Sequence, residues 1–197
     1  MRSLFLTLLI VACCLAPTRV WADDNDSENT TNQFPTGLVY GLHVGVNLVS
    51  SFTGGGLSTV NRIGFQAGLD GKYYFAPNVG LASGLQFVSR GVGTNGAFFL
   101  DIPLALSFRY GGLMAKDSGF SYMDLGGFAS IPFANISASF PTKFGAGLYV
   151  GGGTLFKVTE SFRMGFASWF KFGLANSINS TTANNILELG IGIISLF

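Results

Sequence analysis

One pattern constrains this sequence more than any other. From Gly37 onward, bulky apolar residues recur at every second position in segment after segment. In the clearest segment they occupy the even positions from Phe98 to Tyr110, and Asp101 and Arg109 lie among the odd ones. Side chains that alternate with period two lie on opposite faces of a β-strand, whereas a helix repeats every 3.6 residues. We therefore predict an all-β fold.

Eight alternating segments follow one another along the chain. They span residues 38–48, 63–75, 79–90, 98–110, 123–131, 143–151, 162–172 and 187–197. Most exceed the five or six residues typical of globular strands and match the roughly 9–11 residues of a membrane-crossing strand. Longer polar or glycine-rich connections (49–61, 91–97, 132–142 and 174–185) alternate with shorter ones (76–78 and 157–161) and one of intermediate length (111–119). This plan predicts an eight-stranded antiparallel up-and-down transmembrane β-barrel.

The charged residues of these segments all lie on the face opposite the bulky apolar side chains. An Arg or Lys side chain that meets lipid at mid-depth costs about 2–4 kcal/mol, so we expect the charged face to enclose the lumen. Unpaired charges in a narrow lumen are costly, which predicts an ionic network. Its ten expected members are Asp70, Lys72, Arg90, Asp101, Arg109, Asp124, Lys143, Arg163, Lys171 and Glu188. The expected pairs are Arg90 with Asp101, Arg109 with Asp124, and Lys171 with Glu188.

A water-soluble barrel of the lipocalin kind, which binds an apolar ligand, alternates in the same way but with the two faces exchanged. Two features favour lipid on the outside. Most strand glycines and alanines share the charged face, and small residues suit the crowded lumen of an eight-stranded barrel. Tyr40, Tyr73 and Tyr110 lie near strand ends on the apolar face, where tyrosines form the interfacial girdles of membrane proteins.

The first 22 residues have the three-part pattern of a secretory signal peptide. Arg2 supplies a positive charge, and Leu4–Ala16 is an apolar run of 13 residues, too short to span a bilayer as a helix. The sequence Val-Trp-Ala at 20–22 predicts cleavage after Ala22. A lipoprotein signal is the alternative interpretation, because Ile-Val-Ala-Cys at 10–13 loosely fits a lipobox. We expect export, with cleavage near Ala22.

Cleavage after Ala22 removes both cysteines, Cys13 and Cys14, so the mature chain has no disulfide and no thiolate ligand. Residues 23–36 carry four acids and almost nothing apolar, which predicts a flexible periplasmic tail. The expected organisation is a signal peptide (1–22), this acidic tail, and an outer-membrane barrel (37–197).

Composition and motifs exclude several classes of function. The 11 Lys and Arg residues balance 10 Asp and Glu residues, so no basic field is present to hold nucleic acid. His43 is the single histidine, and no Gly-x-Ser-x-Gly elbow accompanies it. The glycine triplets at 54–56 and 151–153 lack the Lys-Ser/Thr of a phosphate loop. We expect no enzyme, no catalytic residues, no cofactor site and no metal site.

Several segments resemble the outer membrane β-barrel domain family that includes PorT, common in Bacteroidetes-type bacteria. Residues 41–47 read Gly-Leu-His-Val-Gly-Val-Asn, similar to the family's Gly-x-x-x-Gly-x-Asn first strand, with His43 where a Lys is common. Residues 64–69 are similar to its second strand. The most specific match is Phe-Leu-Asp-Ile-Pro-Leu at 99–104, and the main departure is Gly-Leu-Gln-Phe at 84–87, where the family has Glu-Leu-x-Tyr. The resemblance covers 37–197 and implies a Gram-negative outer-membrane barrel.

The predicted role is that of a small outer-membrane barrel, structural or surface-interacting through its longer loops, with a lumen closed by the ionic network. A narrow pore that favours anions is the alternative, although eight strands leave little free channel. The expected partners are outer-membrane lipid and the barrel-assembly machinery. The machinery would recognise the alternating closing strand that ends at Phe197. A surface ligand of unknown identity is the third expected partner.

Overall fold

The computed structural model describes residues 36–53, 56–57, 62–92, 95–111, 119–135, 144–159, 162–174 and 185–197. The expected signal peptide, the acidic tail up to residue 35, both cysteines and Lys143 lie outside these described residues. Within the described ranges, no helix is long and apolar enough to cross a membrane.

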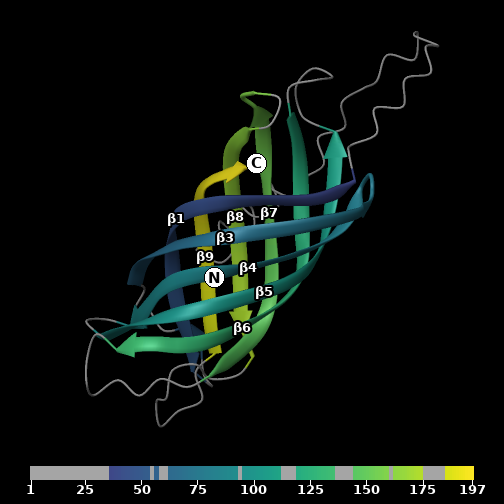
Figure 1. The fold of residues 1–197 in the computed structure, drawn as a ribbon. Coiled ribbons are helices and arrows are strands. Elements are labelled where there is room, and N and C mark those ends of the chain that lie inside the picture. Colours follow the sequence, from purple (N-terminus) through teal and green to yellow (C-terminus); the bar gives the residue numbers. More distant parts are fainter. Residues whose placement is uncertain are drawn as a thin grey trace, which may run out of the picture.

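The described chain is a closed antiparallel β-barrel of eight long strands (Figure 1). They are β1 (Gly37–Thr53), β3 (Arg62–Ala76), β4 (Val79–Val92), β5 (Asn95–Gly111), β6 (Gly119–Asn135), β7 (Gly145–Lys157), β8 (Arg163–Gly173) and β9 (Asn185–Leu196). Each strand pairs with the next along the chain, and β9 pairs with β1 to close the sheet. A two-residue strand, β2 (Gly56–Leu57), pairs antiparallel with Phe52 and Thr53 at the end of β1. The predicted fold class is confirmed.

The two ends of the barrel differ in what they carry. At one end, here called the terminal end, β1 begins and β9 finishes, and the main-chain N–H of Phe197 donates to the carbonyl of Tyr40 at 2.8 Å. The turn at Pro77–Asn78, which joins β3 to β4, lies at the same end. At the opposite end, here called the hairpin end, β4 and β5 meet through the pair Val92 and Asn95.

Several strands run further than the alternation predicts. β1 continues to Thr53, β4 and β5 occupy most of the expected loop at 91–97, and β6 continues to Asn135. These extensions are rich in Ser, Gly, Asn and Ala, with bulky apolar residues such as Val49 and Phe133 only at scattered positions. Main-chain hydrogen bonds to a neighbouring strand do not require that pattern.

The faces of the strands are as the sequence predicts. Phe65, Leu104 and Phe166 point outward and are 45%, 63% and 67% exposed. Every charged side chain whose burial the structure describes is buried or half-buried. The barrel therefore presents an apolar outer wall and encloses its charges.

One stretch of the wall is interrupted between β4 and β5. The paired positions stop at Ser83 with Leu104 and resume at Gln86 with Asp101. Pro103 lies in this gap and has no N–H to donate to a neighbouring strand. The Ser83 hydroxyl donates instead to the Pro103 carbonyl at 2.8 Å, so a side chain replaces part of the missing ladder.

Candidate functional site: the filled lumen

Arg90 of β4 is the centre of a buried ion-pair cluster towards the hairpin end. Its Nη1 donates to Oδ1 of Asp101 at 2.8 Å, its Nη2 to the second oxygen of that carboxylate, and its Nε to Oε2 of Glu188 at 2.6 Å. Lys171 Nζ donates to Oδ2 of Asp101 at 2.7 Å and lies 3.6 Å from Oε1 of Glu188. All four side chains are at most 1% exposed. Two positive charges thus balance two negative ones in a dry environment.

Two neutral side chains complete this cluster. The Ser130 hydroxyl donates to Oδ1 of Asp101 at 2.6 Å and accepts from Nη1 of Arg90 at 2.8 Å. Gln66 Oε1 accepts from Lys171 Nζ at 2.8 Å. With these two, the cluster ties together side chains from β3, β4, β5, β6, β8 and β9.

A second group of charges lies nearer the terminal end. His43 Nδ1 is 2.5 Å from Oδ2 of Asp70. Lys72 Nζ donates to Oδ2 of Asp124 at 2.7 Å and lies 3.4 Å from the centroid of the Tyr122 ring. The close approach of an ammonium to an aromatic face is a cation–π contact, which is stronger when both groups are desolvated.

The expected pair of Arg109 with Asp124 is wrong. Asp124 pairs with Lys72, while Arg109 donates to the carbonyl of Pro77 and stacks on Tyr74, with its Cζ 3.6 Å from the ring centroid. Arg109 lies close to the Pro77–Asn78 turn, where main-chain carbonyls are available as acceptors. The other two expected pairs, Arg90 with Asp101 and Lys171 with Glu188, are present.

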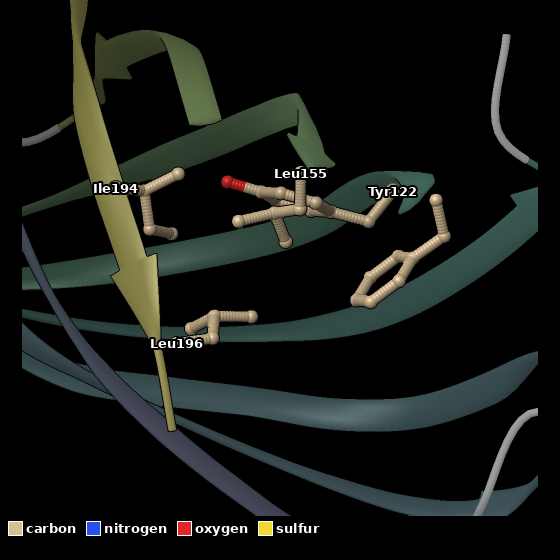
Figure 2. Close-up of a cluster of buried hydrophobic side chains, with 5 residues drawn as sticks. Tyr122, Leu155, Ile194 and Leu196 are labelled. Carbon is tan, nitrogen blue, oxygen red and sulfur yellow. The ribbon is translucent and has the colours of Figure 1, made fainter. Parts of the chain in front are cut away.

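The ion pairs lie between two apolar layers. Towards the hairpin end, Val49, Ala97, Phe99 and Ile186 form a buried cluster. Towards the terminal end, a second cluster fills the lumen (Figure 2), formed by Phe120, Tyr122, Leu155, Ile194 and Leu196. In Figure 2 the side chains of Ile194 and Leu196 project from β9 to the same side, toward Leu155 and Tyr122. Apolar clusters therefore lie on both sides of the ion pairs, and Arg109 and Arg163 border the cluster nearer the terminal end.

Aromatic rings fill the middle of the lumen, and glycines make room for them. A Cβ at Gly45 would lie 2.5 Å from Cη2 of Trp169, and one at Gly190 would lie 2.1 Å from Cε2 of the same indole. A Cβ at Gly147 would similarly lie 2.7 Å from the Phe128 ring. The glycines of the inner face thus pack against large rings, which explains why small residues and aromatic residues share that face.

Little space remains inside. Among the described residues, a cavity of about 30 Å³ is lined by His43, Asp70, Lys72, Asp124 and eleven other residues. A second cavity of about 10 Å³ lies beside Arg90 and Glu188. A cavity needs about 10–15 Å³ to hold one water molecule, so these spaces admit a few waters and exclude a hydrated solute. No three described His, Cys, Asp or Glu side chains are grouped so that they could hold a metal ion.

The outer wall carries aromatic side chains at both ends of its aliphatic band. At the terminal end, the ring of Phe197 lies 6.1 Å from that of Tyr40 and 5.2 Å from that of Phe162, centroid to centroid. Tyr73 and Tyr110 are also exposed. Towards the hairpin end, four rings from β3 to β6 are in contact: Phe65, Phe87, Phe98 and Phe133.

Of the ten residues expected in the lumen, eight are inside it: seven are buried, and Asp70 is half-buried and contacts His43. Lys143 lies outside the described residues. Arg163 is the tenth: it is half-buried, and its Cζ lies 5.7 Å from the centroid of the Phe120 ring. Sequence reasoning did not single out Gln66, Gln86 and Ser130 as parts of the site. Their position on the inner face followed from the alternation, but neutral side chains carry no charge signal that marks them as partners.

Comparison with solved structures finds small outer-membrane barrels. The outer membrane protein OprG from Pseudomonas aeruginosa is 17% identical, with a TM-score of 0.53, over 84% of this chain and 98% of that one. Neisserial surface protein A (NspA) is 12% identical, with a TM-score of 0.56, over 80% of this chain and 97% of that one. These similarities establish that the fold is shared.

No protein-family model matches the sequence, and no curated protein matches it. The resemblance to the family that includes PorT therefore stays a prediction.

Proposed function

We propose that this protein is an integral outer-membrane β-barrel with a closed lumen, which acts as a structural or surface-interaction protein through the connections at its hairpin end. The observation that carries the proposal is the outer wall. It is aliphatic in the middle and aromatic at both ends, and its described exposed side chains are uncharged. An apolar band between two aromatic girdles is the surface of a barrel in a bilayer.

The filled lumen supports a role that does not depend on transport. A paired ionic cluster, two apolar clusters and small cavities of about 30 and 10 Å³ support a lumen without a continuous water-filled path. Such a barrel serves as a rigid support for whatever its connections bind. Loops on rigid scaffolds commonly carry recognition.

The orientation follows from the lengths of the connections. Those between β6 and β7 and between β8 and β9 are among the longest in the chain, and both lie at the hairpin end. Membrane barrels of bacteria have short periplasmic turns and longer extracellular loops. We therefore place the hairpin end outside the cell and the terminal end in the periplasm. The two similar structures, an outer membrane protein and a neisserial surface protein, support an outer-membrane location for this barrel.

Two inexpensive measurements test membrane integration. The protein should stay in the membrane fraction after high-salt extraction, and on a gel it should migrate differently before and after boiling. Release by salt, or recovery as a soluble monodisperse protein without detergent, would contradict the proposal and favour a soluble barrel. If the protein stays in the membrane, crosslinking in intact cells would identify the surface partner.

Planar-bilayer recording tests the closed lumen separately. We expect no stable single-channel steps at neutral pH. Stable anion-selective steps would show that the narrow pore is the correct interpretation instead. Recognition of β9 and Phe197 by the barrel-assembly machinery stays part of the proposal, and replacing Phe197 by Asp should then reduce the amount of assembled barrel.

A further inference from the structure

The lumen contains a hydrogen-bond chain whose direction is fixed at one end. Lys171 Nζ can only donate, so the Gln66 atom 2.8 Å from it must be the carbonyl oxygen Oε1. The amide nitrogen Nε2 of Gln66 then faces the other way, where it donates to Oε1 of Gln86 at 3.2 Å and lies 2.9 Å from Nε2 of His43.

This arrangement determines which nitrogen of His43 carries the proton. Because Gln66 Nε2 is a donor, the His43 Nε2 atom that faces it must be the unprotonated acceptor. The proton of the neutral imidazole then lies on Nδ1, which is 2.5 Å from Oδ2 of Asp70. The chain therefore runs from Lys171 through Gln66 and His43 to Asp70, with every donor matched to an acceptor.

Protonation of His43 breaks this match. A second proton on Nε2 would point at the two hydrogens of the Gln66 amide. The amide can turn to offer Oε1 to the imidazolium, but its nitrogen then faces Lys171 Nζ, and two donors meet. Lys171 keeps its bond to Asp101 at 2.7 Å but loses its bond to β3.

We propose that His43 and Gln66 form an acid-sensitive latch that ties the ionic cluster at the hairpin end to the middle of the lumen and releases it when His43 is protonated. This inference rests on the closed lumen proposed above and adds a means of regulating its rigidity. Histidine is the side chain that ordinarily changes charge between about pH 5 and pH 8.

Several other groups act on His43, and all belong to the inner face. The titratable or charged side chains that line its cavity are Asp70 and Lys72 of β3, Tyr122 and Asp124 of β6, and Tyr149 of β7. β8 contributes the Trp169 ring, 5.9 Å away centroid to centroid, and Lys171 through Gln66. β4 contributes Gln86 and β9 contributes Ile194, both without charge. Of these groups, Gln66 is the one whose hydrogen-bond direction must reverse.

The experiment is nitrogen-15 NMR of the refolded barrel in lipid nanodiscs, without a histidine tag. The sequence contains one histidine, so its two ring nitrogens give signals that need no assignment. At pH 8 we expect a protonated Nδ1 and an unprotonated Nε2. On acidification, the Gln66 side-chain amide signal should move with the same midpoint as the imidazole signals. A protonated Nε2 at pH 8, or a Gln66 amide that does not follow the titration, would overturn the latch.

Two variants separate the hydrogen bond from simple charge. In Gln66→Glu, a carboxylate accepts from both Lys171 and the imidazolium, so His43 should be doubly protonated even at pH 7. Gln86→Glu adds the same charge at a side chain that contacts Gln66, and there His43 should keep the neutral Nδ1–H form. The same doubly protonated state in both variants would overturn the proposal. If Gln66→Glu does not fold, the wild-type titration remains decisive.

The planar-bilayer recording tests the closed lumen, whereas the NMR titration tests the latch, so the two proposals can fail independently. Channel steps at neutral pH would contradict the closed lumen, whatever the NMR shows. A closed barrel whose Gln66 amide ignores the titration would contradict the latch alone.

Discussion

The indole of Trp169 lies directly over Gly190 on the neighbouring strand, so close that a Cβ on Gly190 would be 2.1 Å from Cε2 and 2.2 Å from Nε1 of the ring. Trp169 is 5% exposed. The pair shows how this barrel fills its interior: a large ring on one strand occupies the space that a missing side chain leaves on the next.

Substitution of Gly190 by Ala should destabilise the barrel, because the added Cβ would overlap the indole of Trp169 and force the ring to shift. Overpacking of this kind costs about 1–3 kcal/mol. Urea unfolding in lipid vesicles measures the loss. The matched control is Gly71→Ala, where the added Cβ would meet no atom closer than 4.0 Å, and it should change the free energy of unfolding little. Equal losses in the two variants would contradict the packing account.

Replacement of Arg90 by Leu should be strongly destabilising, because it leaves Glu188 and part of Asp101 buried without their main partner. Breaking a buried ion pair by removing one member costs about 3–5 kcal/mol. The double variant Arg90→Leu with Glu188→Leu restores charge balance and should lose less stability than the single one. If the double variant is the less stable of the two, charge balance is not what the cluster provides.

A positive charge on the outer wall should lower the free energy of unfolding strongly in the middle of the apolar band and only slightly near the end of the barrel. Leu104→Arg places a guanidinium in the middle of the apolar band, where the expected loss is about 2–4 kcal/mol. Leu38→Arg places one at the terminal end, where the expected loss is at most about 1 kcal/mol. Both positions are more than 60% exposed. In a soluble barrel the two substitutions would have similar, small effects.

The interruption beside Pro103 predicts a role for Ser83. Removal of its hydroxyl in Ser83→Ala leaves the Pro103 carbonyl without that donor, and loss of such a hydrogen bond costs about 1 kcal/mol. Ser195→Ala is the control, because its hydroxyl donates over a longer distance, 3.3 Å, to the carbonyl of Leu42. Thermal unfolding of the two variants in the same detergent compares them. A larger loss in the control would show that the β4–β5 gap needs no side-chain support.

The alternation was sufficient to predict the eight long strands and the face of the charged residues within them. It predicts a face because successive side chains of a strand point to opposite faces of the sheet. It carries no information about which inward side chains meet across the lumen. Lys72 and Asp124 lie 52 residues apart on strands that do not pair with each other, and the nearer candidate, Arg109, was therefore chosen wrongly.

The same rule explains why the apolar layers inside the barrel were not foreseen. Leu155 and Leu196 are buried in the lumen at 0% and 2% exposure, although bulky apolar residues were expected outside. Strand ends were also placed too early, since a ladder continues through Gly and Ser residues that break the apolar pattern. Both the buried apolar residues and the strand ends were missed for the same reason. The apolar pattern describes one strand at a time, whereas burial and strand length depend on contacts with neighbouring strands.

Spin-label accessibility in lipid vesicles tests the central claim most directly. A nitroxide attached to a cysteine at position 104 or 166, in a chain that starts at Asp23 and so lacks Cys13 and Cys14, reports which solvent surrounds the outer wall. We predict strong relaxation by oxygen, which concentrates in lipid, and weak relaxation by a water-soluble nickel complex. Strong relaxation by nickel and weak relaxation by oxygen at both positions would contradict it.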